Sequence, residues 1–266
     1  MIPGISSASE RRLSQAMDPA VTDLREASLL GRDFSLIPGD GDEARTLGVA
    51  VAGGGDLTLV VADPARPIGR MSVQVSGRDN VMFFDNVAWG GSLHANVRIL
   101  RSDTVVFFND IGDAYVALPE VFLRSDGQLV FWGRGASAVG CMMEIEGTGR
   151  SVVIGDDALI SAGVWIRNHD MHAIHDLRSG RRIGRPPTDT VLERHVWLGQ
   201  DAMLLNTQRI GTGTIVGARA LVKGSVPPRV VMAGTPARII REGVSWGRDT
   251  YAMTDAERIA IGLDRL

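Results

Sequence analysis

Residues 192–227 read LERHVW LGQDAM LLNTQR IGTGTI VGARAL VKGSVP, one pattern repeated every six residues. Each block opens on an aliphatic residue; these openers are Leu192, Leu198, Leu204, Ile210, Val216 and Val222. Glycine follows three of the openers, at positions 199, 211 and 217. Amphipathic helices repeat near 3.6 residues and strands near 2, so a period of six fits neither. It is typical of a hexapeptide β-helix, in which each block forms a short strand and a corner, the opener points inward and glycine takes the corner.

A fainter six-residue phase precedes this stretch. It runs through Val81, Val87, Leu93, Ile99, Val105 and Ile111, and it returns at Ile154, Ile160 and Ile166. We therefore expect an all-β chain whose solenoid spans residues 71–242. The segment 46–61, TLGVAVAGGGDLTLVV, divides at its glycines and predicts a β-hairpin within a β-rich lead-in at 46–70.

The two ends of the chain differ from the repeat. Residues 9–30 carry helix formers and mixed charge, so we expect residues 1–45 to form an N-terminal helical appendage that packs on the main body or on a neighbouring subunit. Near the other end, Thr254 and Glu257 have the spacing of a capping box. They predict a short C-terminal helix, within a cap at 243–266, that covers the open end of the coil.

Composition narrows the classes of partner. The chain has 266 residues and a net charge of −3, which gives no reason to expect nucleic acid or an anionic membrane as a partner. Its single cysteine, Cys141, excludes an internal disulfide framework and a cysteine-based zinc site, and we expect it to be a small buried residue. No run of 18 apolar residues predicts a membrane span, and the first residues lack the apolar core of a signal peptide. These observations predict a soluble cytoplasmic protein.

A loop interrupts the repeat. Ile166 and Leu192 are 26 residues apart, which is not a multiple of six, so a segment at about 168–190 must leave the coil. Polar excursions from a stiff scaffold commonly carry function, and this one contains His169, His172 and His175. Three interpretations stand: one histidine is a general base oriented by a carboxylate, the three bind a metal ion, or all are solvated loop residues.

Several motifs in this region resemble one family. The loop reads D-M-H-A-I at 170–174 and D-L-R-S-G-R-R-I at 176–183; HVWLGQ follows at 195–200 and AGTPAR at 233–238. In this order and spacing they resemble the hexapeptide-repeat O-acetyltransferases, above all those of bacterial polysaccharides and sugars and, more distantly, the galactoside and maltose enzymes. The resemblance is specific over residues 152–248, weaker over 71–149 and absent over 1–60.

The resemblance implies a left-handed parallel β-helix assembled as a homotrimer, with active sites between subunits. It implies acetyl transfer from acetyl-CoA directly to a hydroxyl of a sugar or polysaccharide, with no metal ion. On the D-x-H motif, His172 is the expected base, which suits a proton acceptor near neutrality, and Asp170 its neighbour. His169 is the rival base, because the galactoside enzymes carry an H-x-x-H loop whose alignment here is ambiguous by three positions. His195 is expected on the coil surface at a subunit contact.

The resemblance also assigns cofactor-binding residues. Four are expected along the pantetheine arm and two at the nucleotide phosphates; in that order they are Gln200, Ala218, Lys223, Gly224, Arg238 and Arg241. The chain departs from the family twice, because Lys223-Gly224 stands in place of a Thr-Lys pair and Arg219 in place of a glycine. Two other functions remain open: a non-catalytic β-helical scaffold, and a metal-dependent hydratase of the γ-carbonic-anhydrase type.

Overall fold

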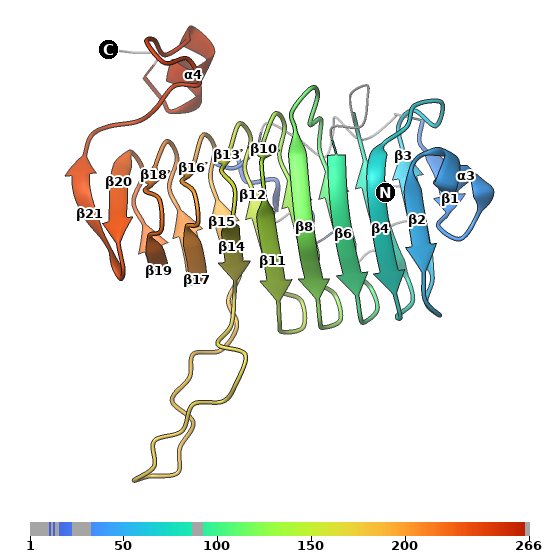
Figure 1. Ribbon diagram of the computed structural model, residues 1–266, viewed down its shortest axis with the longest axis horizontal. Helices are drawn as coiled ribbons and strands as arrows, with labels where there is room; N and C mark the ends of the chain where they lie inside the picture. Colours follow the sequence, from blue (N-terminus) through green and yellow to red (C-terminus); the bar gives the residue numbers. More distant parts are fainter. Residues whose placement is uncertain (1–10, 12, 14–15, 23–32, 87–92, 264–266) are drawn as a thin grey trace.

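The computed structural model describes residues 11, 13, 16–22, 33–86 and 93–263. The described strands join one sheet, which winds into a left-handed parallel β-helix with an extruded loop (Figure 1). The predicted fold class is confirmed. No helix within the described ranges is long and apolar enough to cross a membrane.

The coil has three faces. Face A consists of β2 (Val49–Ala52), β4 (Gly69–Val75), β6 (Leu93–Ile99), β8 (Val116–Leu123), β11 (Cys141–Ile145), β14 (Val164–Arg167), β17 (Met203–Ile210) and β19 (Leu221–Val226). Face B consists of β3 (Leu57–Val61), β5 (Asn80–Phe84), β7 (Val105–Phe108), β9 (Leu129–Trp132), β12 (Ser151–Ile154) and β15 (Thr190–Leu192). Face C consists of β10 (Ser137–Ala138), β13 (Leu159–Ile160), β16 (Trp197–Leu198), β18 (Ile215–Val216) and β20 (Val230–Gly234). Successive strands of a face pair in parallel, whereas β1 (Ser35–Pro38) and β21 (Ala237–Glu242) pair antiparallel to β3 and β20.

The C-terminal repeat has the predicted interior. All six openers of residues 192–227 are fully buried and belong to one core cluster. The glycines after them are required by close approach between coils: a Cβ on Gly199 would lie 2.7 Å from the nitrogen of Ala218, and one on Gly211 would lie 2.4 Å from that of Pro228. Cys141 is buried, as predicted, and burial raises the pKa of its thiol to about 12.

The fainter phase in the N-terminal half has a different origin. Val81 pairs with Val105, 24 residues later, and Val105 pairs with Leu129 after another 24, whereas Leu198 pairs with Val216 after only 18. The first coils are therefore longer than three hexapeptides. Val81, Val105 and Leu129 do not point into the coil as predicted; they lie outside it, in a second apolar cluster with Leu13, Ala16 and Val21 of the N-terminal segment.

The expected hairpin at 46–61 is wrong. β2 pairs with β4 and β3 with β5, both in parallel, so these strands form the first coil and the solenoid begins at Val49 rather than at residue 71. The glycines between them form a corner pressed against the next coil, where a Cβ on Gly53 would lie 2.0 Å from the carbonyl oxygen of Val75. Before this coil, the short helix α3 (Asp42–Thr46) joins β1 to β2.

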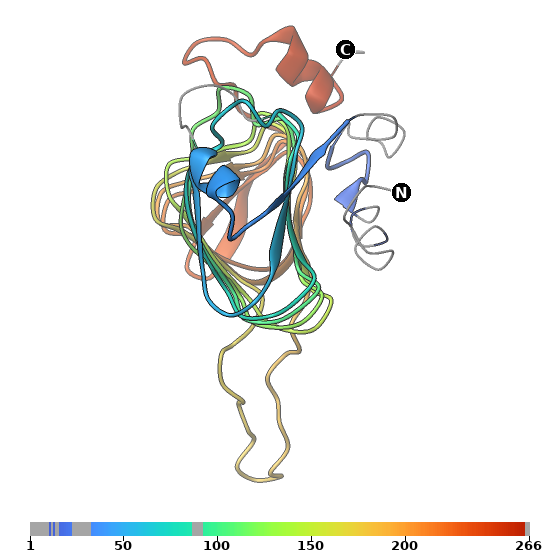
Figure 2. The ribbon, with the colours of Figure 1, turned by 90° about the vertical axis from the view of Figure 1, so that its right-hand side faces the viewer.

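The C-terminal segment binds the side of the coil and does not cover its open end. The helix α4 (Asp255–Ala260) has the predicted capping box, but Figure 2 shows it at the edge opposite the extruded loop. Trp246 stacks on His195 at 4.0 Å, and Arg248 hydrogen-bonds to Asp157 at 2.6 Å and to the carbonyl oxygen of Gly135 at 3.2 Å. His195 is therefore a buried anchor for this segment, not the surface residue that we expected.

Candidate functional site

The extruded loop leaves the coil at the corner between β14 and β15 (Figures 1 and 2). Asn168, the first residue after β14, is fully buried there. Its Oδ1 accepts a hydrogen bond from the N–H of Glu146 at 2.9 Å, and its Nδ2 donates to the carbonyl oxygens of Glu146 and Thr188, each at 2.9 Å. One amide side chain thus ties both ends of the loop to the preceding coil.

A second asparagine holds the returning strand of the loop. Asn206 lies in a register shift of β17 with φ 51°, a left-handed conformation that asparagine tolerates better than most residues. Its Oδ1 accepts a hydrogen bond from the hydroxyl of Thr188 at 2.9 Å. Sequence reasoning did not single out Asn168 or Asn206, although an asparagine at the point where the repeat breaks was a usable signal.

The loop itself has an ordered tip. The carboxylate of Asp176 accepts hydrogen bonds from the backbone N–H and the hydroxyl of Ser179, both at 2.7 Å, and these bonds lower the pKa of Asp176. A β-bridge joins His175 to Arg182 across the loop. The tip is therefore a closed turn between two antiparallel arms.

His169 lies at the root of the loop and is 5% exposed. The N–H of Met171 donates to its Nδ1 at 3.0 Å, while its Nε2 has no hydrogen-bond partner among the described residues. Burial lowers the pKa of His169, against the opposing effect of Glu144 and Glu146. The ring is therefore neutral at pH 7, and because Nδ1 accepts a proton bond, Nε2 carries the hydrogen.

His172 and Asp170 lie on the same turn but are not bonded through their side chains. The N–H of His172 donates to the carbonyl oxygen of Asp170 at 2.7 Å. The imidazole of His172 is exposed and makes no hydrogen bond to any described residue. His175 lies further out, with Nδ1 3.4 Å from the carbonyl oxygen of Gly180. Within the described ranges, no group of three histidine, cysteine or acidic residues is placed to hold a metal ion, and the three loop histidines do not converge.

A groove on face A runs up to the root of the loop. It encloses about 270 Å³ and is lined by Phe122, Arg124, Met142, Glu144, Trp165, Arg167 and Met171, among others. The side chain of Glu144 is 8% exposed and lies between two guanidinium groups, 2.6 Å from Arg124 and 3.0 Å from Arg167. The guanidinium of Arg167 also lies 3.9 Å above the ring of Trp165. This charged row was not anticipated from the sequence.

The six expected cofactor residues lie on the outer surface of the last coils, but not in one pocket. Gln200 and Ala218 occupy equivalent corners of successive coils, where Gln200 accepts a backbone hydrogen bond from Arg219 at 2.8 Å. Lys223 and Gly224 lie on β19, at the corner that carries the loop two coils earlier. Arg238 and Arg241 are exposed on β21. Arg219 takes the left-handed conformation, with φ 58°, at the position where the family has glycine.

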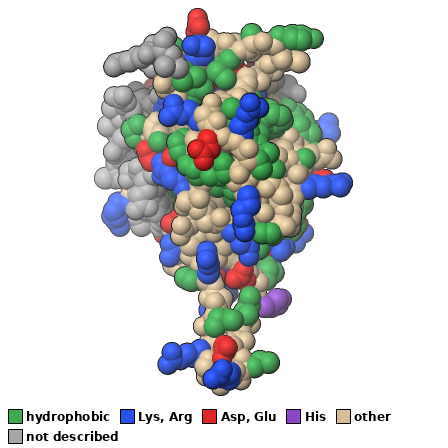
Figure 3. Space-filling view, turned by 90° about the vertical axis from the view of Figure 1, so that its left-hand side faces the viewer, with side chains coloured by type: hydrophobic (Ala, Val, Ile, Leu, Met, Phe, Trp, Pro, Cys, Tyr) green, Lys and Arg blue, Asp and Glu red, His purple; other side chains and the backbone are tan. Residues whose placement is uncertain are grey.

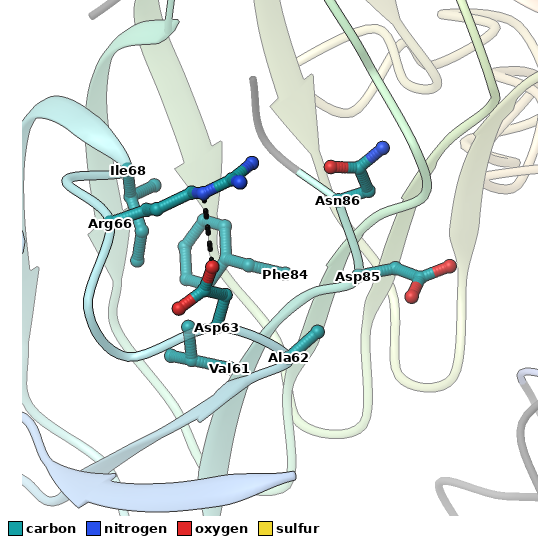
Figure 4. A pocket seen from close by; sticks show the side chains of 8 residues that line it. All are labelled: Val61, Ala62, Asp63, Arg66, Ile68, Phe84, Asp85 and Asn86. Carbon is teal, nitrogen blue, oxygen red and sulfur yellow. Dashed lines mark ion pairs between the residues drawn. The ribbon is translucent and has the colours of Figure 1, made fainter. Parts of the chain in front are cut away.

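Another pocket lies at the N-terminal end of the coil, away from every candidate residue. It is lined by Val61, Ala62, Asp63, Arg66, Ile68, Phe84, Asp85 and Asn86. Figure 4 shows Arg66 reaching across its mouth to Asp63, and these side chains form an ion pair of 3.0 Å. The polar lining is thereby partly neutralised, and no loop histidine reaches it.

Comparison with known proteins identifies relatives of one kind. No protein-family model matches the chain. WbbJ of Escherichia coli K12, named as an O-acetyl transferase of lipopolysaccharide biosynthesis, is 33% identical over 149 residues, which are 46% of this chain and 75% of WbbJ. The polysialic acid O-acetyltransferase of Escherichia coli O1:K1 is 31% identical over 130 residues, 49% of this chain but only 42% of that protein.

Solved structures agree on the fold. The crystal structure of the polysialic-acid-specific acetyltransferase NeuO superposes with a TM-score of 0.63 and 24% identity, over 77% of this chain and 90% of NeuO. At that identity the likeness shows the fold alone. The match to WbbJ, which spans three quarters of that protein at more than 30% identity, goes further, and the relatives are O-acetyltransferases that act on sugars and polysaccharides. The chain therefore belongs to the hexapeptide-repeat sugar O-acetyltransferases.

Proposed function

We propose that this chain transfers an acetyl group from acetyl-CoA to a hydroxyl of a sugar or polysaccharide, with His172 as the general base. One observation favours His172 over His169. The nitrogen of His169 that could accept a proton already accepts the N–H of Met171, whereas both ring nitrogens of His172 are free of bonds to described residues. A base must present an unused lone pair to the hydroxyl that it deprotonates.

The reaction follows from that assignment. The acceptor oxygen attacks the thioester carbon while its proton passes to the imidazole of His172, so a C–O bond forms and the carbonyl oxygen becomes an oxyanion. Collapse of the tetrahedral intermediate breaks the C–S bond, and the imidazolium returns the proton to the departing thiolate of coenzyme A. Backbone N–H groups are suited to hold the oxyanion. Asp170, beside His172 on the same turn, is proposed to orient the base or the acceptor.

His169 is proposed as a support for the base. Met171, between the two histidines, has φ 64°, a left-handed conformation that costs an ordinary residue about 1–2 kcal/mol. The hydrogen bond from its N–H to His169 offsets part of this cost, by about 1 kcal/mol. His169 thereby fixes the turn from which His172 projects.

The cofactor is proposed to lie along the last coils. Gln200, Ala218, Lys223 and Gly224 would contact the pantetheine arm, while Arg238 and Arg241 would pair with the phosphates, a role that suits the guanidinium fork. Arg241 and Arg238 are exposed and carry no ion pair to described residues, which leaves them available. No step of acetyl transfer requires a metal ion in this mechanism.

We also propose a homotrimer. The candidate residues of one chain lie at two corners and on a loop that projects away from the coil, and in one subunit they do not enclose a common pocket. A neighbouring copy beneath the loop would complete the site. Release of coenzyme A by the purified protein, measured over a panel of sugar acceptors, tests the function; no release with any acceptor, together with no binding of acetyl-CoA, would contradict it.

A further inference from the structure

The outer part of the loop concentrates positive charge on a chain whose net charge is −3. Four arginines fall within eight residues: Arg178, Arg181, Arg182 and Arg185. Between residues 171 and 187 the chain offers one carboxylate against them, that of Asp176. Because Asp176 is held by Ser179, it closes the turn rather than pairing with an arginine. The loop is therefore a local centre of positive potential.

These arginines are presented without partners. All four are exposed, and no ion pair or side-chain hydrogen bond joins any of them to a residue that the structure describes. Figure 3 shows basic side chains together with apolar ones at the far end of the projection. The apolar side chains include Leu177, which is 99% exposed, and Ile183, which is 61% exposed. Such a surface combines anion-binding groups with apolar contacts for the C–H faces of a bound molecule.

The backbone holds this surface in place. The Asp176–Ser179 turn closes the tip, the bridge between His175 and Arg182 joins the arms, and Asn168 fixes the root. A positioned set of guanidinium groups loses less conformational entropy on binding than a flexible basic tail would. The arginines also follow His172 along the same loop, so a long molecule bound to them can reach the base.

We propose that the arginine-bearing arm, residues 177–185, is a docking site for an anionic polysaccharide, bound through carboxylate groups on several of its sugars. This inference rests on the proposed function, since the bound polymer is the acetyl acceptor. The arm contacts sugars remote from the reacting hydroxyl. Its contribution is therefore equal in the ground state and the transition state, which affects KM for the polymer rather than kcat.

Binding can be tested without turnover. The probe is an oligogalacturonate of about ten sugars, and a neutral dextran oligomer of equal length is the control ligand. Three exposed pairs of modest strength add up to about a tenfold change in affinity. We expect Arg178→Ser/Arg181→Ser/Arg185→Ser to bind oligogalacturonate about tenfold more weakly by calorimetry, and the corresponding triple lysine variant to bind nearly as well as wild type. Binding of the charged probe to wild type should also weaken at high salt.

A control variant with the same change of charge, Arg70→Ser/Arg101→Ser/Arg258→Ser, should bind like wild type, because these exposed arginines lie outside the loop. Equal losses in both serine variants, or equal binding of dextran and oligogalacturonate, would overturn the proposal. So would a change in sedimentation confined to the loop variant, because the arginines would then bind a second copy of the chain. Acetyl transfer to neutral sugars without oligogalacturonate binding would refute this inference alone, whereas binding without any transfer would refute the proposed reaction alone.

Discussion

The His172→Ala variant should lose acetyl transfer, whereas His169→Asn should keep it. The first change removes the imidazole whose nitrogens are free of bonds to described residues. The second removes an imidazole but keeps an acceptor, because the amide oxygen of asparagine takes nearly the place of Nδ1. The N–H of Met171 can then still donate its hydrogen bond, which is 3.0 Å long in the wild-type chain.

The sizes of these effects differ by orders of magnitude. Loss of a positioned general base lowers a rate by about 100- to 10,000-fold, which is about 3–5 kcal/mol of activation free energy. His169→Ala removes one hydrogen bond worth about 1 kcal/mol and loosens the turn at Met171, so its cost in kcat should be about fivefold. His169→Asn should lie between that value and wild type.

The assay is release of coenzyme A under saturating acceptor, with acetyl-CoA affinity measured separately by calorimetry. All three variants should bind acetyl-CoA like wild type, because the expected cofactor residues lie on the coil and not on the loop. If His169→Ala and His169→Asn both abolished turnover while His172→Ala did not, the base would be His169 and the loop motif would be aligned three residues out. If none of the three mattered, His175 or a loop carboxylate would have to act as the base.

Four further outcomes are expected. Arg238→Ala or Arg241→Ala should each weaken acetyl-CoA binding about tenfold in calorimetry, the loss of one charge-assisted contact, and unchanged affinity in both would move the nucleotide site elsewhere. Sedimentation should show a trimer, and a stable monomer would remove the shared site. Asn168→Ala breaks three hydrogen bonds at a buried position, so the free energy of unfolding should fall by about 2–3 kcal/mol, measured by denaturant titration. Because burial lowers the pKa of His169, the unfolded chain binds more protons than the folded one below about pH 6.5, and stability should decline as the pH falls through that range. His169→Asn should remove that part of the decline in thermal unfolding between pH 7.5 and 5.5.

The C-terminal coils could be predicted from the sequence because their geometry repeats in whole hexapeptides. Leu204 pairs with Val222 and Leu198 with Val216, each 18 residues on, so every opener returns to the same side of the coil. In the first coils the return takes 24 residues, which is also a multiple of six. The six-residue phase through Val81 and Val105 therefore persisted although these side chains lie outside the coil.

The charged row of the groove was hidden for a related reason. Arg124, Glu144 and Arg167 are 20 and 23 positions apart, and no short motif joins them. They meet because β8, β11 and β14 stack in register, which depends on coil lengths that a hexapeptide count does not give. The loop histidines, in contrast, sit within a few residues of one another, so local motifs were enough to select them. What the motifs could not show is that His169 has its proton-accepting nitrogen occupied by Met171.

The change in coil length explains why the loop leaves where it does. In the long coils the interior is wide enough for rings, and Phe84, Phe108 and Trp132 point inward and stack along the axis. Beyond the loop the inward residues are aliphatic, as Leu192 and Ile210 show, because an 18-residue coil encloses less space. Successive coils of unequal length cannot keep every corner in register, so the difference must be accommodated at a corner. The corner after Arg167 is where the coil narrows, and a loop inserted there interrupts no strand of either kind. The candidate base thus stands at the boundary between wide coils, which carry the charged groove, and narrow coils, which carry the residues expected to bind the cofactor.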